Sequence, residues 1–421
     1  MVVPKLRFKE FESTVEVRKL GNISNIVVGF VGTVSDQYCD QNEGIPFVRT
    51  QNVRDGYFSV ENLEYVTRDF HKKNKKSQIF NGDVLIARVG ANMGMVCAVE
   101  NLDTEANCAN VIIIKNNLQL NSQYLSLFLN SENGQKQIHS GGAGGAQAVF
   151  NTTLAKEISF PYFPLQEQTK IASFLSAVDE KISQLTQKHE LLSQYKQGMM
   201  QKLFSQQIRF KADDGSEFGE WEEVKFSGIF NFHQTNSYSR ALLAEYGEIM
   251  NIHYGDIHTK FSMLFDVNKE SVPFLNDEVD TSKIAKEQFL KVGDLVIADA
   301  SEDYKDIGKS IEVISLNNQK VVAGLHTYIA RPVKPFALGF CGYMMQTFPV
   351  REQIKKLATG ISVLGISKTN LGKVELKVPS LEEQTKIANF LSAIDQKIEV
   401  VVQQIEQAKT WKKGLLQQMF V

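Results

Sequence analysis

The stretch LQEQTKIASFLSAVDEKI, residues 165–182, occurs a second time as LEEQTKIANFLSAIDQKI, residues 381–398. The two copies lie 216 residues apart, and 14 of their 18 positions are identical. The likeness continues downstream at the same offset, where Phe204 matches Phe420. A repeat this strong predicts a protein built from two similar halves.

Each copy has the apolar spacing of a long helix that packs against a partner helix. Apolar residues alternate at intervals of four and three, the a/d pattern of a coiled coil, interrupted at His189, Lys196 and Lys412. About 40 residues at 1.5 Å each predict a rod of roughly 60 Å, and we expect the two rods to pair antiparallel. The alternative, that each helix packs only on its own domain, is disfavoured because the seams match in length and register. The predicted seam consists of Ile171, Leu175, Val178, Ile182, Leu185, Ile387, Leu391, Ile394, Ile398, Val401 and Ile405.

The segments between the helices predict two mixed domains of the same plan. VGDLVIAD at 292–299 matches NGDVLIAR at 81–88, and MNIHYGDIHTKF at 250–261 matches PFVRTQNVRDGYF at 46–58. We expect strands at 84–87 and up to Lys115, and one helix over 123–138. The prediction is an α+β chain with a pseudo-two-fold repeat, divided as a domain over 1–160, a helix over 161–205, a domain over 206–378 and a helix over 379–421.

Composition favours a globular intracellular protein with two or three domains. The 421 residues carry a net charge of −2 and 43% hydrophobic residues. No apolar run is long enough to span a membrane, the N-terminal residues lack the apolar core of a signal peptide, and the four cysteines suggest no disulfide framework. We therefore expect a cytoplasmic protein.

Charge argues against tight DNA binding by the chain alone. Residues 1–160 carry 16 basic and 16 acidic residues, and residues 206–378 carry 20 and 23. Tight binding to the phosphate backbone needs a basic surface. If the chain reads DNA, we expect a partner to supply part of the phosphate contacts.

Catalytic motifs are not found in the sequence. GKS at 308–310 lacks the glycine of a phosphate-binding loop, because Asp303 occupies that position. GGAGGA at 141–146 is interpreted as a surface loop. His253 and His258 are poorly spaced for a metal site in the strand and turn predicted there. We therefore interpret the chain as non-catalytic, with no metal and no cofactor of its own.

Polar clusters lie at matching places in the two domains. Arg, Asn and Gln side chains can make bidentate contacts with base edges, and lysines suit phosphates. Taken alone, the first cluster is better explained as an ordinary polar turn and a solvated lysine face. The candidates in the first domain are Arg49, Thr50, Gln51, Asn52, Arg54, Lys72, Lys73, Lys75, Lys76, Arg88 and Asn92. Those in the second are Asn251, His253, Tyr254, Asp256, His258, Lys260, Asp299 and Ser301.

Taken together, these features resemble the specificity subunit of type I restriction-modification systems. The likeness rests on the two EQTKIA helices, each closing a domain that contains a GD(V/L)(L/V)IA strand, and on QKLFSQQIRFK at 201–211 followed by GEWEEVK at 219–225. The resemblance implies that each domain reads one half of a split double-stranded DNA site and that the helices act as a spacer. It also implies two modification subunits that bind S-adenosylmethionine and methylate adenine, joined by restriction-translocase subunits.

Two other interpretations remain at the level of sequence. The helix pair alone would also suit a coiled-coil scaffold that binds only proteins. A self-contained methyltransferase or nuclease is disfavoured by the missing catalytic motifs.

Overall fold

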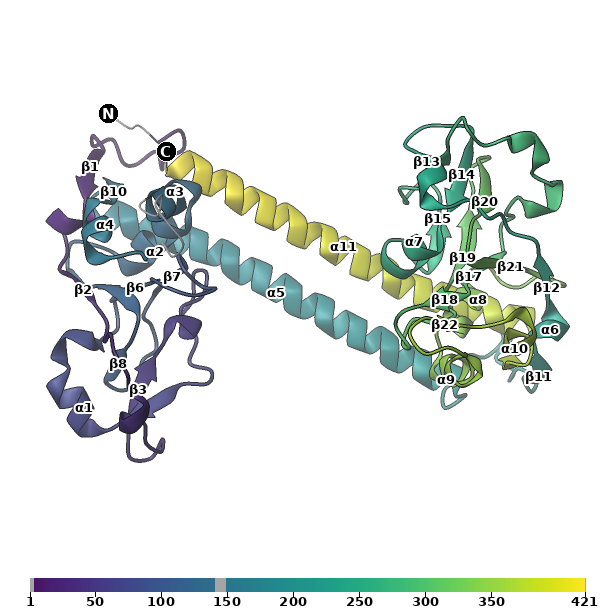
Figure 1. Ribbon diagram of the computed structural model, residues 1–421, viewed down its shortest axis with the longest axis horizontal. Coiled ribbons are helices and arrows are strands. Elements are labelled where there is room, and N and C mark those ends of the chain that lie inside the picture. The colour runs from purple at the N-terminus through teal and green to yellow at the C-terminus, as the bar shows by residue number, and fades with distance from the viewer. Residues whose placement is uncertain (1–3, 141–148, 421) are drawn as a thin grey trace. The chain divides into compact units, whose positions relative to one another are not determined.

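The computed structural model describes residues 4–140 and 149–420, so the GGAGGA segment lies outside the described residues. The chain divides into two compact units, which are described separately (Figure 1). Unit 1 comprises Met1–Gln187 and Gln403–Val421, and unit 2 comprises Lys188–Val402. The long helices α5 (Leu165–Phe204) and α11 (Leu381–Met419) each contribute to both units.

Unit 1 is a mixed α/β structure. Its strands are β1 (Glu16–Lys19), β2 (Ile26–Val28), β3 (Ile45–Val48), β4 (Glu64–Val66), β5 (Gln78–Ile79), β6 (Val84–Ala87), β7 (Val96–Ala98), β8 (Ala106–Cys108), β9 (Val111–Ile114) and β10 (Ser159–Tyr162). Its short helices are α1 (Arg68–Lys73), α2 (Ser122–Asn130), α3 (Glu132–Ser140) and α4 (Thr152–Glu157).

Unit 2 has the same kind of composition. Its strands are β11 (Glu222–Lys225), β12 (Phe230–His233), β13 (Leu243–Ala244), β14 (Ile249–Ile252), β15 (Leu264–Asp266), β16 (Phe274–Leu275), β17 (Leu295–Ala298), β18 (Ala300–Ser301), β19 (Ser310–Ser315), β20 (Lys320–Ala323), β21 (Thr327–Pro332), β22 (Leu364–Gly365) and β23 (Glu375–Val378). Its short helices are α6 (Phe226–Ile229), α7 (Tyr254–Thr259), α8 (Phe340–Met345), α9 (Phe348–Leu357) and α10 (Lys368–Leu371).

The sheets of the two units share one topology. In unit 1 the strand orders are β2-β9-β6-β7 and β4-β3-β8-β5. In unit 2 the orders β12-β21-β17-β19 and β16-β14-β20 correspond to β2-β9-β6-β7 and β4-β3-β8, with β15 and β13 added at the edges and an isolated bridge, Phe289 with Val322, at the place of β5. The pairs β3–β8 and β14–β20 are both parallel. The predicted α+β fold with a pseudo-two-fold repeat is confirmed by this shared topology.

The GD motif has a structural role in both units. Asp83 is 1% exposed, accepts from the backbone N–H of Phe80 at 3.0 Å and pairs with Lys115 at 2.8 Å. Asp294 is 0% exposed and accepts two bonds from Arg331, at 2.8 and 2.7 Å. Each aspartate thus ties the turn before the central strand to its neighbours, which keeps a buried charge partnered.

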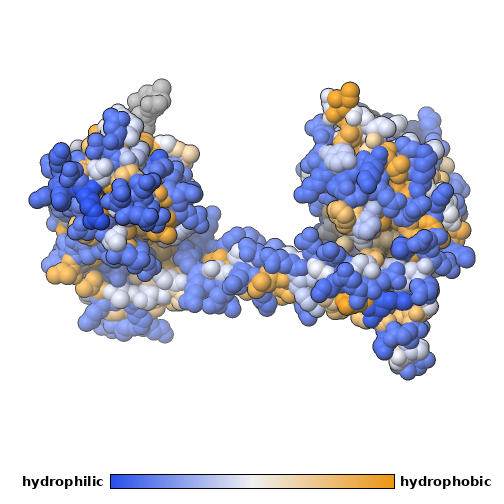
Figure 2. Space-filling view, turned by 90° about the horizontal axis from the view of Figure 1, so that it is seen from below, coloured by the Kyte–Doolittle hydropathy of each residue, from blue (hydrophilic) through white to orange (hydrophobic). Residues whose placement is uncertain are grey.

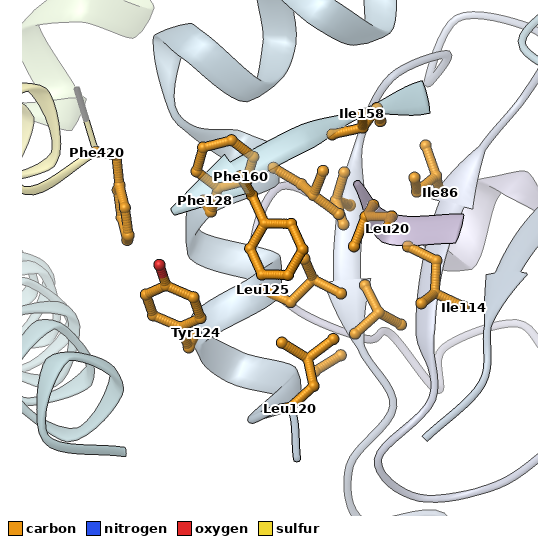
Figure 3. Close-up of a cluster of buried hydrophobic side chains, with 14 of the residues drawn as sticks. Leu20, Ile86, Ile114, Leu120, Tyr124, Leu125, Phe128, Ile158, Phe160 and Phe420 are labelled. Atoms are coloured by element: carbon orange, nitrogen blue, oxygen red, sulfur yellow. The ribbon is translucent and has the colours of Figure 1, made fainter. Parts of the chain in front are cut away.

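The long helices pack into the domain cores as well as against each other. Nine of the eleven predicted seam residues are buried, while Ile182 and Ile398 are half-buried. In unit 1, Leu175 of α5 joins the same core as Tyr124 and Phe128. Phe420, just after α11, stacks edge-on against Tyr124 and Phe128, with ring centroids 5.5 and 5.7 Å apart (Figure 3).

Ion pairs between the helices explain two of the seam interruptions. In unit 1, Lys412 of α11 pairs with Asp179 of α5 at 2.6 Å. In unit 2, Lys196 of α5 pairs with Asp395 of α11 at 2.5 Å. The two pairs are related by the 216-residue offset of the repeat. Each lysine therefore continues the helix contact with a charge pair in place of an apolar residue.

Two equivalent ion pairs fix the beginning of each long helix. In unit 1, the guanidinium of Arg7 donates to both carboxylate oxygens of Glu167, at 2.6 and 2.7 Å. In unit 2, Arg209 donates to both oxygens of Glu383, at 3.0 and 2.7 Å. Both glutamates are buried, at 0% and 1% exposure, and a bidentate arginine offsets the cost of that burial.

The glutamine of each EQ pair joins the helix to its domain. The side-chain oxygen of Gln168 accepts from the backbone N–H of Asn121 at 2.9 Å, just before α2. Gln384 accepts in the same way from Ala337 at 3.0 Å, before α8. The repeated EQ pairs are thus explained by equivalent contacts in the two units.

The arginines of these ion pairs lie on equivalent segments. The segment 6–9, LRFK, packs on the end of α11. There the backbone N–H groups of Lys5 and Leu6 donate to the backbone carbonyl of Gln418 at 2.9 and 3.2 Å. The segment 208–211, IRFK, directly follows α5 in the chain. In each unit, therefore, the segment at the end of one long helix holds the beginning of the other.

Two local predictions are wrong. The single helix expected over 123–138 is divided into α2 and α3 at Ser131, whose hydroxyl donates to the carbonyl of Phe128. The tight crossing there requires Gly134, because a Cβ would lie 2.3 Å from the carbonyl oxygen of Phe128. The strand and turn expected around His253 and His258 are instead the capped start and last turn of α7.

We expect Arg209→Ala to lower the free energy of unfolding of unit 2 by roughly 3–5 kcal/mol, because the carboxylate of Glu383 would stay buried without its cation. Urea denaturation of the full chain measures this loss. The matched control is Lys211→Ala, which removes an exposed pair with Glu217 and should change stability little. Equal effects of the two substitutions would contradict the structural role of the buried pair.

Candidate nucleic-acid interface

Three loops of unit 1 meet where β3, β6 and β8 end. The side-chain amide of Asn92 donates to the carbonyl of Thr50 at 3.0 Å, which joins the loop after β6 to the loop after β3. The backbone N–H of Arg88 donates to the carbonyl of Asn110 at 3.3 Å, which joins the loop after β6 to the turn after β8. The structure thereby brings together most of the polar residues predicted from the first cluster.

The side chains of this loop cluster differ in exposure. Gln51 and Arg54 are exposed, whereas Arg49, Thr50 and Arg88 are half-buried. Arg49 pairs with Glu64 at 3.0 Å. Among the described residues, the Nε atoms of Arg49 and Arg88 are buried and have no hydrogen-bond partner. Each of these two guanidinium groups thus has one donor that no described residue accepts from.

Asn52, a predicted DNA-contact residue, is buried in the loop after β3. Asn52 is 1% exposed, and its amide donates to the carbonyls of Ser59 and Glu61 at 3.1 and 3.0 Å. Its side-chain oxygen accepts from the backbone N–H of Arg49 at 3.0 Å. The side chain therefore shapes the loop from inside, and the half-buried Asn92 holds the same loop through Thr50.

The predicted lysine cluster lies on the segment between β4 and β5. Because β4 runs antiparallel to β3, the end of β4 pairs with the beginning of β3, Val66 with Ile45. The exposed lysines follow β4, on the last turn of α1 and the turn after it, and are Lys72, Lys73, Lys75 and Lys76. Because β5 runs antiparallel to β8 and Gln78 pairs with Asn107, the turn that holds Lys75 and Lys76 lies beside the end of β8.

In unit 2, the residues after β14 form an aromatic and imidazole cluster around Tyr254. The ring of Tyr254 lies 4.7 Å from that of His253, 6.2 Å from that of His258 and 5.4 Å from that of His326, measured between centroids. Tyr254 is half-buried and His326 is exposed. This arrangement offers a ring face and polar edges at the place where unit 1 has its loop cluster.

The carboxylate of Asp256 holds two cations over this cluster. Asp256 accepts from Arg240 at 3.0 Å and pairs with Lys260 at 3.2 Å. Lys260 and Arg240 are both exposed. They are therefore placed at the surface by a buried acid.

Several predicted contact residues of unit 2 are buried. Asp256, His253 and Ser301 are 0%, 8% and 6% exposed. His253 accepts from the backbone N–H of Gly255 at 3.1 Å, and burial, followed by the charge of Arg240, lowers its pKa. The hydroxyl of Ser301 donates to the carbonyl of Asp303 at 2.9 Å. These side chains shape the loops.

Two further candidates of unit 2 differ in their internal contacts. His258 is half-buried and donates from Nε2 to the carbonyl of Ala300 at 3.0 Å. Asn251 is 0% exposed, and both atoms of its amide lack a partner among the described residues. The amide of Asn251 is therefore enclosed within unit 2.

The sequence patterns missed Arg240, His326 and Asn110. Arg240 lies in a loop far from the other candidates in sequence and is brought in by Asp256. His326 and Asn110 each stand alone before an apolar strand, so no polar cluster marked them. The 216-residue offset of the repeat relates these two residues and could have found them.

A shallow groove lies between α5 and α11 in unit 1. It has a volume of about 590 Å³ and is lined by Phe174, Val178, Leu185 and Trp411, among others. The rings of Phe174 and Trp411 meet edge-on at 5.9 Å, and Trp411 remains 54% exposed. In unit 2 the repeat places Tyr195, 51% exposed, at the position of Trp411.

Residues 4–140 and 149–420 contain no group of histidine, cysteine and acidic side chains placed to hold a metal ion. None of the helices in these ranges is long and apolar enough to cross a membrane.

Comparison with known proteins identifies the family. The family described as type I restriction modification DNA specificity domain matches residues 12–194 and 219–410. The chain belongs to this family. It is therefore a non-catalytic DNA specificity subunit of a type I restriction-modification system.

Individual members of the family show the same likeness. The specificity subunit of the type I restriction enzyme MjaVIII from Methanocaldococcus jannaschii is 25% identical, over 88% of this chain and 87% of its own length. The S subunit from M. genitalium has the same fold, with a TM-score of 0.57 at 15% identity over 100% of this chain and 99% of that chain. A chain from a structural study of complex assembly in the type I R-M system gives 0.54 at 14% identity over 96% of each.

We expect Asn52→Ala to lower the free energy of unfolding of unit 1 by about 1–3 kcal/mol, because it removes three hydrogen bonds from a buried site. Gln51→Ala, the neighbouring exposed position, should stay within about 0.5 kcal/mol of the parent. Chemical denaturation of both variants measures the difference. A stable Asn52→Ala chain would contradict its role inside the loop.

Proposed function

We propose that each unit of this specificity subunit reads one half of a split double-stranded DNA target. The proposal rests on the equivalent positions of the loop clusters in the two units. Matching places after matching strands hold Thr50 in unit 1 and Tyr254 in unit 2, and likewise Arg88 and Asp299. The same scaffold with different chemistry at its surface suits two readers of two different sequences.

The scaffold beneath these loops is the same in both units. The backbone N–H of Asn52 donates to the carbonyl of Arg49 at 2.9 Å, and that of Asp256 donates to the carbonyl of His253 at 2.9 Å. Both Asn52 and Asp256 are buried. Shared internal contacts thus support side chains that differ where a ligand would meet them.

The charge distribution supports a reader that works with partners. Figure 2 shows that hydrophilic residues cover much of the viewed face of each unit, yet the net charge of the chain is only −2. Phosphate contacts dominate the affinity of DNA-binding proteins. The lysines of α1 and the turn after it would supply some of these contacts, and a partner would supply the rest.

We infer that the paired long helices set the distance between the two half-sites and bind two modification subunits. A repeated surface offers two equivalent docking places to two identical partners. Hydrophobic residues reach the surface of the long helices in Figure 2, and the exposed rings of Trp411 and Tyr195 occupy equivalent positions.

In this scheme the modification subunits bind S-adenosylmethionine and methylate adenine. Restriction-translocase subunits would join the same complex. The specificity subunit itself then needs no cofactor, because it contributes only the position and register of the complex on DNA.

We expect Arg49→Ala and Gln51→Ala to change only the half-site read by unit 1. Loss of one good base contact costs about 1–3 kcal/mol of discrimination. The experiment is selection of bound sites from random DNA by the assembled modification complex. Tyr254→Ala is the matched variant in unit 2 and should change only the other half. Unchanged recognition of both halves by all three variants would refute the assignment.

We expect Trp411→Ala combined with Tyr195→Ala to weaken capture of the modification subunit by about 30-fold, the effect of losing a central aromatic contact. Titration of purified subunits by calorimetry measures the affinity. Lys409→Ala is the control, because it removes only an exposed pair with Glu406 on the same helix. Full affinity of the double variant would place the docking surface elsewhere.

A further inference from the structure

Asn110 and His326 share an unusual backbone conformation at equivalent places. Their φ angles are +55° and +57°, in the left-handed region that residues other than glycine rarely adopt. Asn110 lies between β8 and β9, and His326 lies between β20 and β21. Such a conformation costs free energy and is kept where the surrounding structure imposes it, often at functional sites.

The same backbone contact holds both residues. The carbonyl of Asn110 accepts from the N–H of Arg88 at 3.3 Å, and that of His326 accepts from the N–H of Asp299 at 3.1 Å. Arg88 and Asp299 each follow the central GD strand. The two turns are therefore one feature of the fold, repeated in both units.

In each unit, the residue with the positive φ angle lies close to a residue that follows β3 or β14. These pairs are Asn110 with Thr50 in unit 1 and His326 with Tyr254 in unit 2. Asn110 and Thr50 line the same small cavity of about 180 Å³ in unit 1. In unit 2, the ring of His326 lies 5.4 Å from that of Tyr254, and its Nδ1 lies 3.1 Å from a carboxylate oxygen of Asp299. Three different loops thus converge in each unit.

We propose that Asn110 and His326 are base-reading residues, each completing a three-residue recognition site. The sites are Thr50, Arg88 and Asn110 in unit 1, and Tyr254, Asp299 and His326 in unit 2. This inference rests on the proposed function, because it assigns the contacts through which each unit reads its half-site.

The side chains of the proposed recognition sites are more exposed than those of the scaffold residues. The side chain of His326 is 48% exposed and that of Asp299 is 20% exposed. Asn110, Thr50 and Arg88 are half-buried. The scaffold residues beneath them, Asn52 and Asp256, are buried in both units, so the positions that differ in chemistry are the ones a base can reach.

The chemistry of the two sites predicts different partners. Arg88 is a donor and suits the O6 and N7 acceptors of guanine, and Asn110 can pair with the edge of adenine. Asp299 is an acceptor and suits the exocyclic amino group of cytosine or adenine. His326 holds this carboxylate in place, so the unit 2 site should require a base that presents an amino group in the major groove.

Glycine substitution tests the side chain without straining the turn. Glycine adopts a positive φ freely, so Asn110→Gly and His326→Gly should fold with unchanged or slightly higher stability. The matched controls are Asn101→Gly and Asn318→Gly, which change exposed left-handed asparagines at φ +55° and +60° elsewhere in units 1 and 2. All four chains are assembled with modification subunits.

The readout is the set of sites selected from random DNA. We expect Asn110→Gly to lose roughly tenfold or more discrimination at one base pair of the first half-site, and His326→Gly to do so in the second half-site only. The two controls should leave both halves unchanged. Unaltered discrimination in both folded variants would overturn the proposal, and so would equal weakening on all sequences, which is the mark of a phosphate contact.

The Arg49→Ala and Tyr254→Ala variants separate this inference from the proposed function. If they change their half-sites while Asn110→Gly and His326→Gly do not, only the reading role of the left-handed residues fails. If no variant in either unit changes a half-site, the proposed division of reading between the units fails as well.

Discussion

The bidentate pairing of an arginine with a buried glutamate is the contact on which the rest of the structure depends. Arg7 with Glu167 and Arg209 with Glu383 each join the beginning of one long helix to the segment at the end of the other. A carboxylate taken out of water without a cation would cost several kcal/mol. This ion pair fixes the position and orientation of the long helix on its domain. The positions of the strands that carry the loops depend in turn on that helix.

Buried polar side chains also hold the structure together within each domain. Buried acids such as Asp83 and Asp294 hold the central strand, and Asn52 and Asp256 hold the loop after β3 and β14. None of these side chains needs to change when the DNA sequence to be read changes. The residues compared at the strand ends, Arg88 with Asp299 and Asn110 with His326, differ in charge or chemistry and reach the surface, where a new side chain disturbs packing least. This separation explains how two units with little sequence identity keep one topology.

Much of the fold could be predicted from sequence, because its signals are local or repeated. The helices follow from apolar spacing, and the GD strands follow from a turn and a buried apolar run. The loops were harder to predict. Asn52 reads as a polar surface residue, and only the folded loop shows that it is turned inward. His326 lies far in sequence from its companions, since Asp299 follows β17 and Tyr254 begins α7. The break between α2 and α3 depends on a close approach at Gly134 that periodicity does not reveal.

The most direct test of the central claim is to map adenine methylation across the host genome with and without this gene, in cells that express the modification subunit. If the two units read the two halves of one site, we expect methylation to be lost at one split motif, which consists of two short blocks separated by a constant gap. Loss of methylation at one continuous motif would contradict reading by two units. An unchanged methylation map, with the modification subunit shown to be active and bound to this chain, would contradict the role of the chain in choosing the site.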